Sequence, residues 1–201
     1  MNLTIALAGF VLMLLQSVLV RELSAALISC EVTILIVIAA YWTGLSIGYG
    51  ISSRLSSRAM AALSVAAFGL QMGLAVVRLW PLAGLALGLR GGWILAWLFA
   101  LAMPLPLCYG ALVTHLIGRR SGGAFQAAYR SDILGALIGL ALLGGLSLLE
   151  GPWLWITYLG AAAWLTWRIV PHRAVRALVV LALAVYLPLL GPIAEWQTRQ
   201  F

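Results

Sequence analysis

Charged residues are scarce in this sequence. They make up 8% of the 201 residues, lysine does not occur, and only five residues are acidic. Soluble domains carry about one quarter charged residues, so the composition excludes a soluble globular domain. The 64% share of hydrophobic residues and the mean hydropathy of +1.10 instead predict a protein that lies in a lipid bilayer.

Cysteine and histidine are also rare, with two of each. Cys30 and Cys108 lie far apart, in or beside apolar runs, so neither a disulfide framework nor a Cys-x-x-Cys site is expected. His115 and His172 lack the spacing of paired haem ligands, and no cluster of His, Cys and carboxylates has metal-ligand spacing. No Ser or Cys has a nearby base and orienting acid. We therefore expect no cofactor, no metal and no enzyme activity of this chain alone.

Seven apolar runs approach or exceed the length of about 20 residues that crosses a bilayer. These runs are residues 1–20, 32–52, 59–77, 92–117, 133–149, 153–167 and 177–194. Pro104 and Pro106 interrupt the fourth run and predict a kink, and residues 79–89 are an interfacial or re-entrant segment about half a span long. The prediction is an all-α integral membrane bundle of about seven transmembrane helices, six or eight if this segment pairs with a neighbour. Residues 1–201 then form one transmembrane domain, with no soluble domain.

Arginines orient the predicted bundle. All 12 basic residues are Arg, and they lie singly or in pairs at the ends of the apolar runs. The loops after the second, fourth and sixth spans carry most of them: Arg54, Arg58, Arg119, Arg120, Arg130, Arg168, Arg173 and Arg176. Since cytoplasmic loops are enriched in basic residues, the N-terminus is predicted to be cytoplasmic. Arginines in such loops contact anionic lipid headgroups, so we expect the bilayer, and no nucleic acid, as a partner.

Glycines in two spans predict close helix packing. Gly44 and Gly48 in the second span, and Gly135 and Gly139 in the fifth, have the spacing of a GxxxG motif. This spacing brings small residues to one helix face and permits two backbones to approach closely. It is typical of a contact between helices and says little about a substrate.

Polar residues near the span ends form the candidate site. They are Gln16, Arg21, Glu22, Glu31 and Asp132. Charges at or inside the membrane are costly and usually paired, and Arg21 could pair with Glu31 or Asp132 where helix ends meet. Two interpretations stay open, namely a structural clamp at the membrane boundary and a polar site for a cation or proton.

Two segments, about a third of the chain, resemble the membrane domain of the fused, multi-spanning spermidine-synthase-like proteins of bacteria. Residues 8–58 resemble that family's Q-x-x-x-x-R-E-L segment, acidic residue and glycine-rich second span through Gln16, Arg21, Glu22, Glu31, Gly44 and Gly48. Residues 118–139 resemble its G-R…Y-x-x-D/N-x-L-G-A-x-x-G signature through Gly118, Arg119, Tyr129, Asp132, Gly135 and Gly139. Fused members carry an aminopropyltransferase-like domain after the spans, and the printed sequence reaches Phe201 without one. The resemblance therefore implies the membrane half alone, in a bacterial cytoplasmic membrane.

The leading hypothesis is a non-catalytic anchor, scaffold or accessory subunit of a membrane complex. Its partner would be an aminopropyltransferase-like enzyme or a respiratory or photosynthetic complex. In one version, the chain is the membrane part of a spermidine-synthase-like enzyme whose catalytic half is on another chain. The alternative is a half-transporter or dimeric carrier for a small solute such as a polyamine. The glycine faces, the interrupted fourth span and the segment GYGISSRLSSR, weakly similar to a loop of major-facilitator transporters, favour that alternative.

Overall fold

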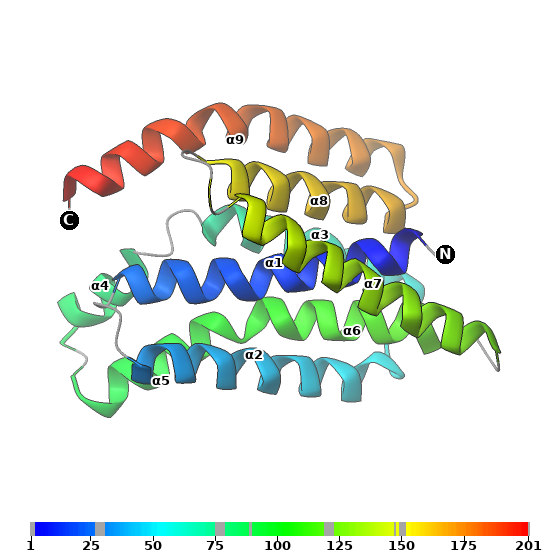
Figure 1. The fold of residues 1–201 in the computed structure, drawn as a ribbon, viewed down its shortest axis with the longest axis horizontal. Helices are drawn as coiled ribbons and strands as arrows, with labels where there is room; N and C mark the ends of the chain where they lie inside the picture. The colour runs from blue at the N-terminus through cyan, green and yellow to red at the C-terminus, as the bar shows by residue number, and fades with distance from the viewer. Residues whose placement is uncertain are drawn as a thin grey trace.

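The computed structural model describes residues 3–26, 31–74, 79–88, 90–118, 123–146, 148 and 152–200. Its helices are α1 (Leu3–Ala26), α2 (Glu31–Ser52), α3 (Ser57–Gly73), α4 (Leu79–Ala86), α5 (Gly92–Ala102), α6 (Pro104–Gly118), α7 (Gly123–Leu146), α8 (Trp153–Ile169) and α9 (Arg173–Gln200). No strand occurs within the described residues. The long helices lie roughly side by side along the long axis of the molecule (Figure 1). The predicted all-α helical bundle is confirmed.

Five segments of the described chain are long and apolar enough to cross a membrane. They are Leu3–Ser24, Glu31–Ser52, Gly92–Gly118, Phe125–Leu146 and Arg173–Pro192. Helices α3 and α8 have 17 residues each, at the lower limit of the range of about 17–25 for a spanning helix. The chain is therefore a multi-pass membrane protein by length and composition, and the number of spans, five or seven, depends on α3 and α8.

The first and last helices place the two ends of the described chain at opposite ends of the bundle (Figure 1). We call the end where α1 begins the arginine-rich end, because six described arginines lie toward it. These are Arg54, Arg58, Arg130, Arg168, Arg173 and Arg176. Arg21, Arg90 and Arg199 lie toward the opposite end. Arg78, Arg119, Arg120 and Cys30 lie outside the described residues.

Helix α1 forms the centre of the bundle. Of its spanning segment 61% is buried, against 22% for α7 and 11% for α9. It contacts α2, α6, α7 and α8, and Ala8, Val11, Leu14 and Leu15 are completely buried. A helix that is apolar on every face needs such a central position, whereas α7 and α9 keep one side exposed.

Three helices extend well beyond the apolar runs that predicted them. Helix α9 does so at both ends, since it covers Arg173–Gln200 where the run covers 177–194. Helix α7 begins at Gly123 rather than at residue 133, so Arg130 and Asp132 lie inside a helix and not in a loop. Helix α1 continues past its Arg-Glu pair to Ala26. The prediction ended each span at the first charge. A charged residue can nevertheless lie within a helix when its side chain extends away from the apolar face. Arg130 does so, since it is exposed.

The fourth span is interrupted at Met103, directly before the predicted prolines. Helix α5 ends at Ala102 and α6 begins at Pro104, and Leu107 N donates to Met103 O across the junction (3.1 Å). Pro104 and Pro106 thus fall in the first turn of α6, where a missing N–H donor costs least. Helix α4, the predicted half-span, has eight residues and packs against α5 at the end of the bundle opposite the arginine-rich end (Figure 1).

Candidate functional site

The structure separates the polar residues that were predicted to lie together. Arg21 lies toward the end of α1, whereas Asp132 of α7 packs against Gly9, near the beginning of α1. The helix between Gly9 and Arg21 is about 18 Å long at 1.5 Å per residue. A pair between Arg21 and Asp132 is therefore impossible in this fold, which corrects that part of the prediction.

The ion pair at the far end of α1 is local. Arg21 Nε lies 3.5 Å from Glu22 Oε1, and the Glu22 side chain is 3% exposed while that of Arg21 is 52% exposed. Glu31 is exposed in the first turn of α2, where a carboxylate interacts favourably with the helix dipole. Gln16 is half-buried in α1. None of these four residues lines the pocket described below, and Arg21 and Glu22 pair within one helix.

Asp132 instead lines a pocket of about 380 Å³ between α2, α6 and α7, near the arginine-rich end. The lining residues are Tyr49, Val113, Thr114, Ile117, Gly118, Phe125, Tyr129 and Asp132. The Thr114 hydroxyl donates to Gly110 O of its own helix (2.9 Å). The polar groups left for a ligand are therefore one carboxylate and two phenols, one from α2 and one from α7.

The carboxylate of Asp132 has an oxygen without a hydrogen-bond partner in the described part of the chain. Its Oδ1 is buried without a hydrogen bond and lies against Gly9, where an added Cβ would be 2.7 Å from Oδ1. Asp132 follows Phe125, the first residue of the spanning segment, by about 10 Å of helix. A charge at the centre of a spanning helix costs about 2.5–3.5 kcal/mol on insertion scales, and a charge about 10 Å from the start of the segment bears part of that cost. This position therefore needs a proton or a positive group.

The predicted glycine faces lie in the two most extensive helix contacts, α2 with α6 and α1 with α7. A Cβ added at Gly48 would lie 2.7 Å from Ala111 N of α6, and Gly44 faces α6 one turn away. A Cβ added at Gly135 would overlap the Ala6 carbonyl of α1, and one at Gly139 would lie 3.2 Å from Phe10 O. These glycines let the backbones touch, as the GxxxG spacing predicts.

Asp132 belongs to the glycine face of α7. Asp132, Gly135 and Gly139 are spaced three and four residues apart, so they share one side of the helix. That side packs on α1 through Gly9, Ala6 and Phe10. The motif that matters is thus a carboxylate followed by two glycines, and not the glycine pair alone.

Sequence reasoning missed a group of buried tyrosines. Gln71 Nε2 of α3 donates to Tyr109 OH of α6, and Tyr41 OH of α2 donates to Leu12 O of α1 (3.2 Å). Tyr158 of α8 is completely buried, and its hydroxyl has no hydrogen-bond partner in the described helices. Hydrogen bonds between spanning helices stabilise a bundle by about 0.6 kcal/mol on average. The available signal was Gln71, a lone amide inside an apolar run.

Comparisons with known proteins assign no family to the chain. No family model matches it, and neither the curated proteins nor the solved structures give a match. Among the described residues no three His, Cys, Asp or Glu side chains are grouped so that they could hold a metal ion, and Cys108 is a buried free thiol. A functional interpretation therefore depends on the pocket around Asp132 and on the helices that form it.

Proposed function

We propose that this chain is a non-catalytic membrane module, an anchoring or accessory subunit that binds a partner protein along α7. The position of Asp132 carries the proposal. Its carboxylate lies inside a spanning helix, beside a pocket, without a positive partner among the described residues. Ionisable groups inside the membrane normally pair or serve a function, and an Arg or Lys of a partner helix would supply the missing charge.

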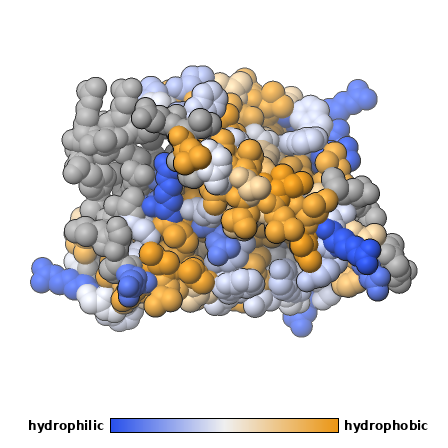
Figure 2. Space-filling model, in the orientation of Figure 1, coloured by the Kyte–Doolittle hydropathy of each residue, from blue (hydrophilic) through white to orange (hydrophobic). Residues whose placement is uncertain are grey.

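The outer side of α7 is accessible to such a partner. Its spanning segment is 22% buried, and its large side chains away from α1 are 39–56% exposed. They are Phe125, Tyr129, Ile133, Leu134, Leu137, Ile138, Leu140 and Leu142. Figure 2 shows hydrophobic surface over the place of α7 in Figure 1. A helix side that faces only lipid needs to be apolar and nothing more. The Asp132 carboxylate at the edge of this surface therefore favours a protein partner over lipid.

The pocket suits a cation that approaches from the side of α7. Tyr49 and Tyr129 are 45% and 54% exposed, so the rings that line the pocket also reach the surface. Aromatic faces attract cations, more strongly when water is excluded. A guanidinium or ammonium group placed between these rings would neutralise Asp132.

The resemblance to spermidine-synthase-like membrane domains supports one class of partner, an aminopropyltransferase-like enzyme. The pocket lies near the arginine-rich end, and arginine-rich loops are typical of the cytoplasmic side. We therefore place the partner contact on the cytoplasmic side of a bacterial inner membrane. A respiratory or photosynthetic complex is the alternative partner.

Purification of the wild type and of Asp132→Asn in mild detergent tests the proposal. We expect the wild type to recover a stoichiometric partner and the variant to bind it about 30-fold or more weakly, since breaking a buried charge pair costs about 2–5 kcal/mol. Glu31→Gln is the matched control, because it removes an exposed carboxylate at the other end of the bundle. Equal recovery with all three proteins, or a lone folded monomer from the wild type, would contradict the proposal.

The same pocket favours one second candidate, a half-transporter or dimeric carrier for an organic cation such as a polyamine. Its volume of about 380 Å³ lies within the usual range of about 300–1,000 Å³ for small-molecule sites. Exchange of labelled spermidine in proteoliposomes separates the two functions. Counterflow that Asp132→Asn abolishes would support the carrier, and flux equal to that of empty vesicles would exclude it.

A further inference from the structure

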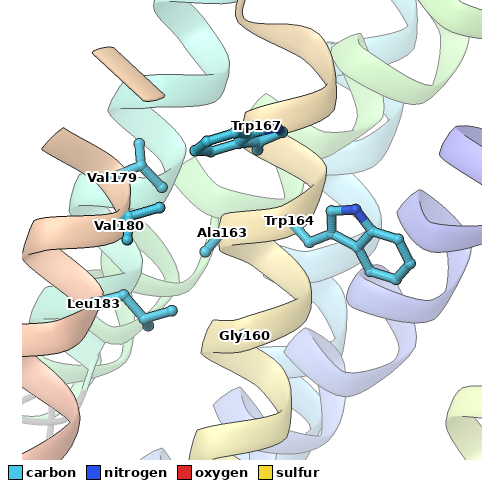
Figure 3. Close-up of a pocket in the computed structure, with 7 residues that line it drawn as sticks. All are labelled: Gly160, Ala163, Trp164, Trp167, Val179, Val180 and Leu183. Carbon is cyan, nitrogen blue, oxygen red and sulfur yellow. The ribbon is translucent and has the colours of Figure 1, made fainter. Parts of the chain in front are cut away.

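An apolar groove of about 290 Å³ separates α8 from α9. Gly160 and Ala163 form its α8 wall, and Val179 and Leu183 form its α9 wall. Figure 3 shows the α9 side chains pointing toward α8, with the ring of Trp167 lying across one end of the groove. From Trp167 to Gly160 the groove follows about 10 Å of helix. Apart from the indoles of Trp164 and Trp167, its lining side chains are aliphatic or absent, so the groove suits a hydrocarbon chain better than a polar ligand.

The end of the groove at Trp167 is strongly positive. Arg168 lies in the last turn of α8, and Arg173 and Arg176 lie in the first turn of α9. Arg168 and Arg173 are exposed, as is His172 in the turn. No acidic residue occurs in the sequence between Glu150 and Glu195. In the α8–α9 hairpin, an apolar groove therefore ends at a cluster of three arginines, and the hairpin has no acidic residue beside them.

Arg176 is held in place at this junction. Its Nε donates to Val170 O (2.7 Å), and its guanidinium carbon lies 5.5 Å from the centroid of the Trp167 ring. A guanidinium has five N–H donors in a planar fork that matches phosphate oxygens. One donor is used by Val170, so the remaining donors can bind an anion beside the mouth of the groove.

We propose that the α8–α9 groove binds one anionic phospholipid, with its phosphate on Arg173 and Arg176 and an acyl chain between the helices. Basic sites between membrane helices recognise anionic headgroups, and the groove continues from the arginines toward the middle of the helices. A second copy of the chain fits less well, since a symmetric contact here would bring six like charges together. The spanning segment of α9 is also the least buried of the five, as expected for a helix that faces lipid.

Native mass spectrometry of the full chain in mild detergent tests this site. Phosphatidylglycerol and phosphatidylcholine with identical acyl chains are added together. We expect one retained phosphatidylglycerol per chain and a loss of about tenfold or more in the variant R173Q/R176Q, because each Arg near the surface contributes substantially to anionic lipid binding. R54Q/R58Q, which removes two exposed arginines at the same end of the bundle, should bind as the wild type.

Gly160→Leu tests the acyl part of the site without changing its charge. No atom lies within 4 Å of a Cβ added at Gly160, so the variant should fold and fill the groove, lowering phosphatidylglycerol retention severalfold. Gly69→Leu, at an exposed and equally open glycine of α3, is the control. The proposal is overturned by equal retention of both lipids, by equal losses in the variants and their controls, or by a wild-type dimer that Gly160→Leu dissociates.

Discussion

Two helix pairs, α2 with α6 and α1 with α7, pack by the same device but differ in charge. In the first pair Gly44, Gly48 and Gly110 bring neutral backbone against neutral backbone. In the second pair Gly9 and Gly135 do the same, but the carboxylate of Asp132 lies in the contact. Close packing needs only the glycines. Since α2 and α6 pack closely without a charge, the packing of α7 on α1 does not require the Asp132 carboxylate.

The two pairs also differ in what covers them. The spanning segment of α7 is 22% buried, against 33% for α2 and 44% for the segment that contains α6, and the far side of α7 is exposed along its length. A contact that other helices enclose stabilises the fold. A contact at the surface of the bundle can also be part of an interface, which is why the proposed function depends on α7.

The largest effect is expected from Gly135→Leu. A side chain here meets the Ala6 carbonyl, which is backbone of the central helix, so α7 must leave α1. We expect the free energy of unfolding to fall by about 3 kcal/mol or more, above the usual range for overpacking. Thermal unfolding in detergent, followed by circular dichroism, measures it. Gly145→Leu, on the same helix with no atom near its added Cβ, is the control, and equal stability of the two variants would contradict the close contact.

Gly48→Ala should have the next largest effect. Its methyl group would lie 2.7 Å from Ala111 N, and overpacking of this kind costs about 1–3 kcal/mol. Gly50→Ala, two residues away with open space around its added Cβ, should be neutral or slightly stabilising because alanine favours the helix. The partner recovery of a folded Gly48→Ala should equal that of the wild type. Loss of the partner in this variant would contradict the proposal that only the α1–α7 pair takes part in partner binding.

Apolar run length and glycine spacing were sufficient to predict most of the fold. The runs predicted the helices, and Gly44, Gly48, Gly135 and Gly139 predicted faces that pack closely, since both depend on local sequence. Neither signal could name the partner helices. That α2 meets α6 and α7 meets α1 follows from the three-dimensional arrangement, which has no counterpart in residue spacing.

The candidate site was predicted in part only. Asp132 was identified because a charge beside an apolar run is unusual, but it was grouped with Arg21, which lies at the other end of α1. The grouping treated both residues as boundary charges, whereas the α7 helix begins before Asp132 and carries it inward. Tyr49 and Tyr129 were not predicted as pocket residues, because tyrosines near span ends are expected in any membrane protein.

Asp132→Asn should change stability in the opposite direction to the glycine variants. It keeps the shape of the side chain and removes a charge that has no partner in the described structure. We expect the free energy of unfolding to rise by about 1 kcal/mol, a fraction of the cost of a charge inside the membrane. Glu31→Gln should leave it unchanged. A fall in the stability of Asp132→Asn would show that the carboxylate holds α7 on α1, and the two helix pairs would then differ in structure rather than in function.

Arg21→Gln should have the smallest effect. Arg21 is 52% exposed and pairs at 3.5 Å with its buried neighbour Glu22, and an ion pair whose cation stays in contact with solvent stabilises a protein by about 1 kcal/mol or less. The thermal midpoint of the variant should be slightly below that of the wild type. This difference in thermal midpoint should shrink at high salt because salt screens exposed charges. A loss above about 3 kcal/mol, insensitive to salt, is typical of a broken buried pair. Glu22 would then be a second intramembrane carboxylate that requires a cation. The contrast with Asp132 would be that Glu22 has its cation within this chain, whereas the cation proposed for Asp132 comes from a partner.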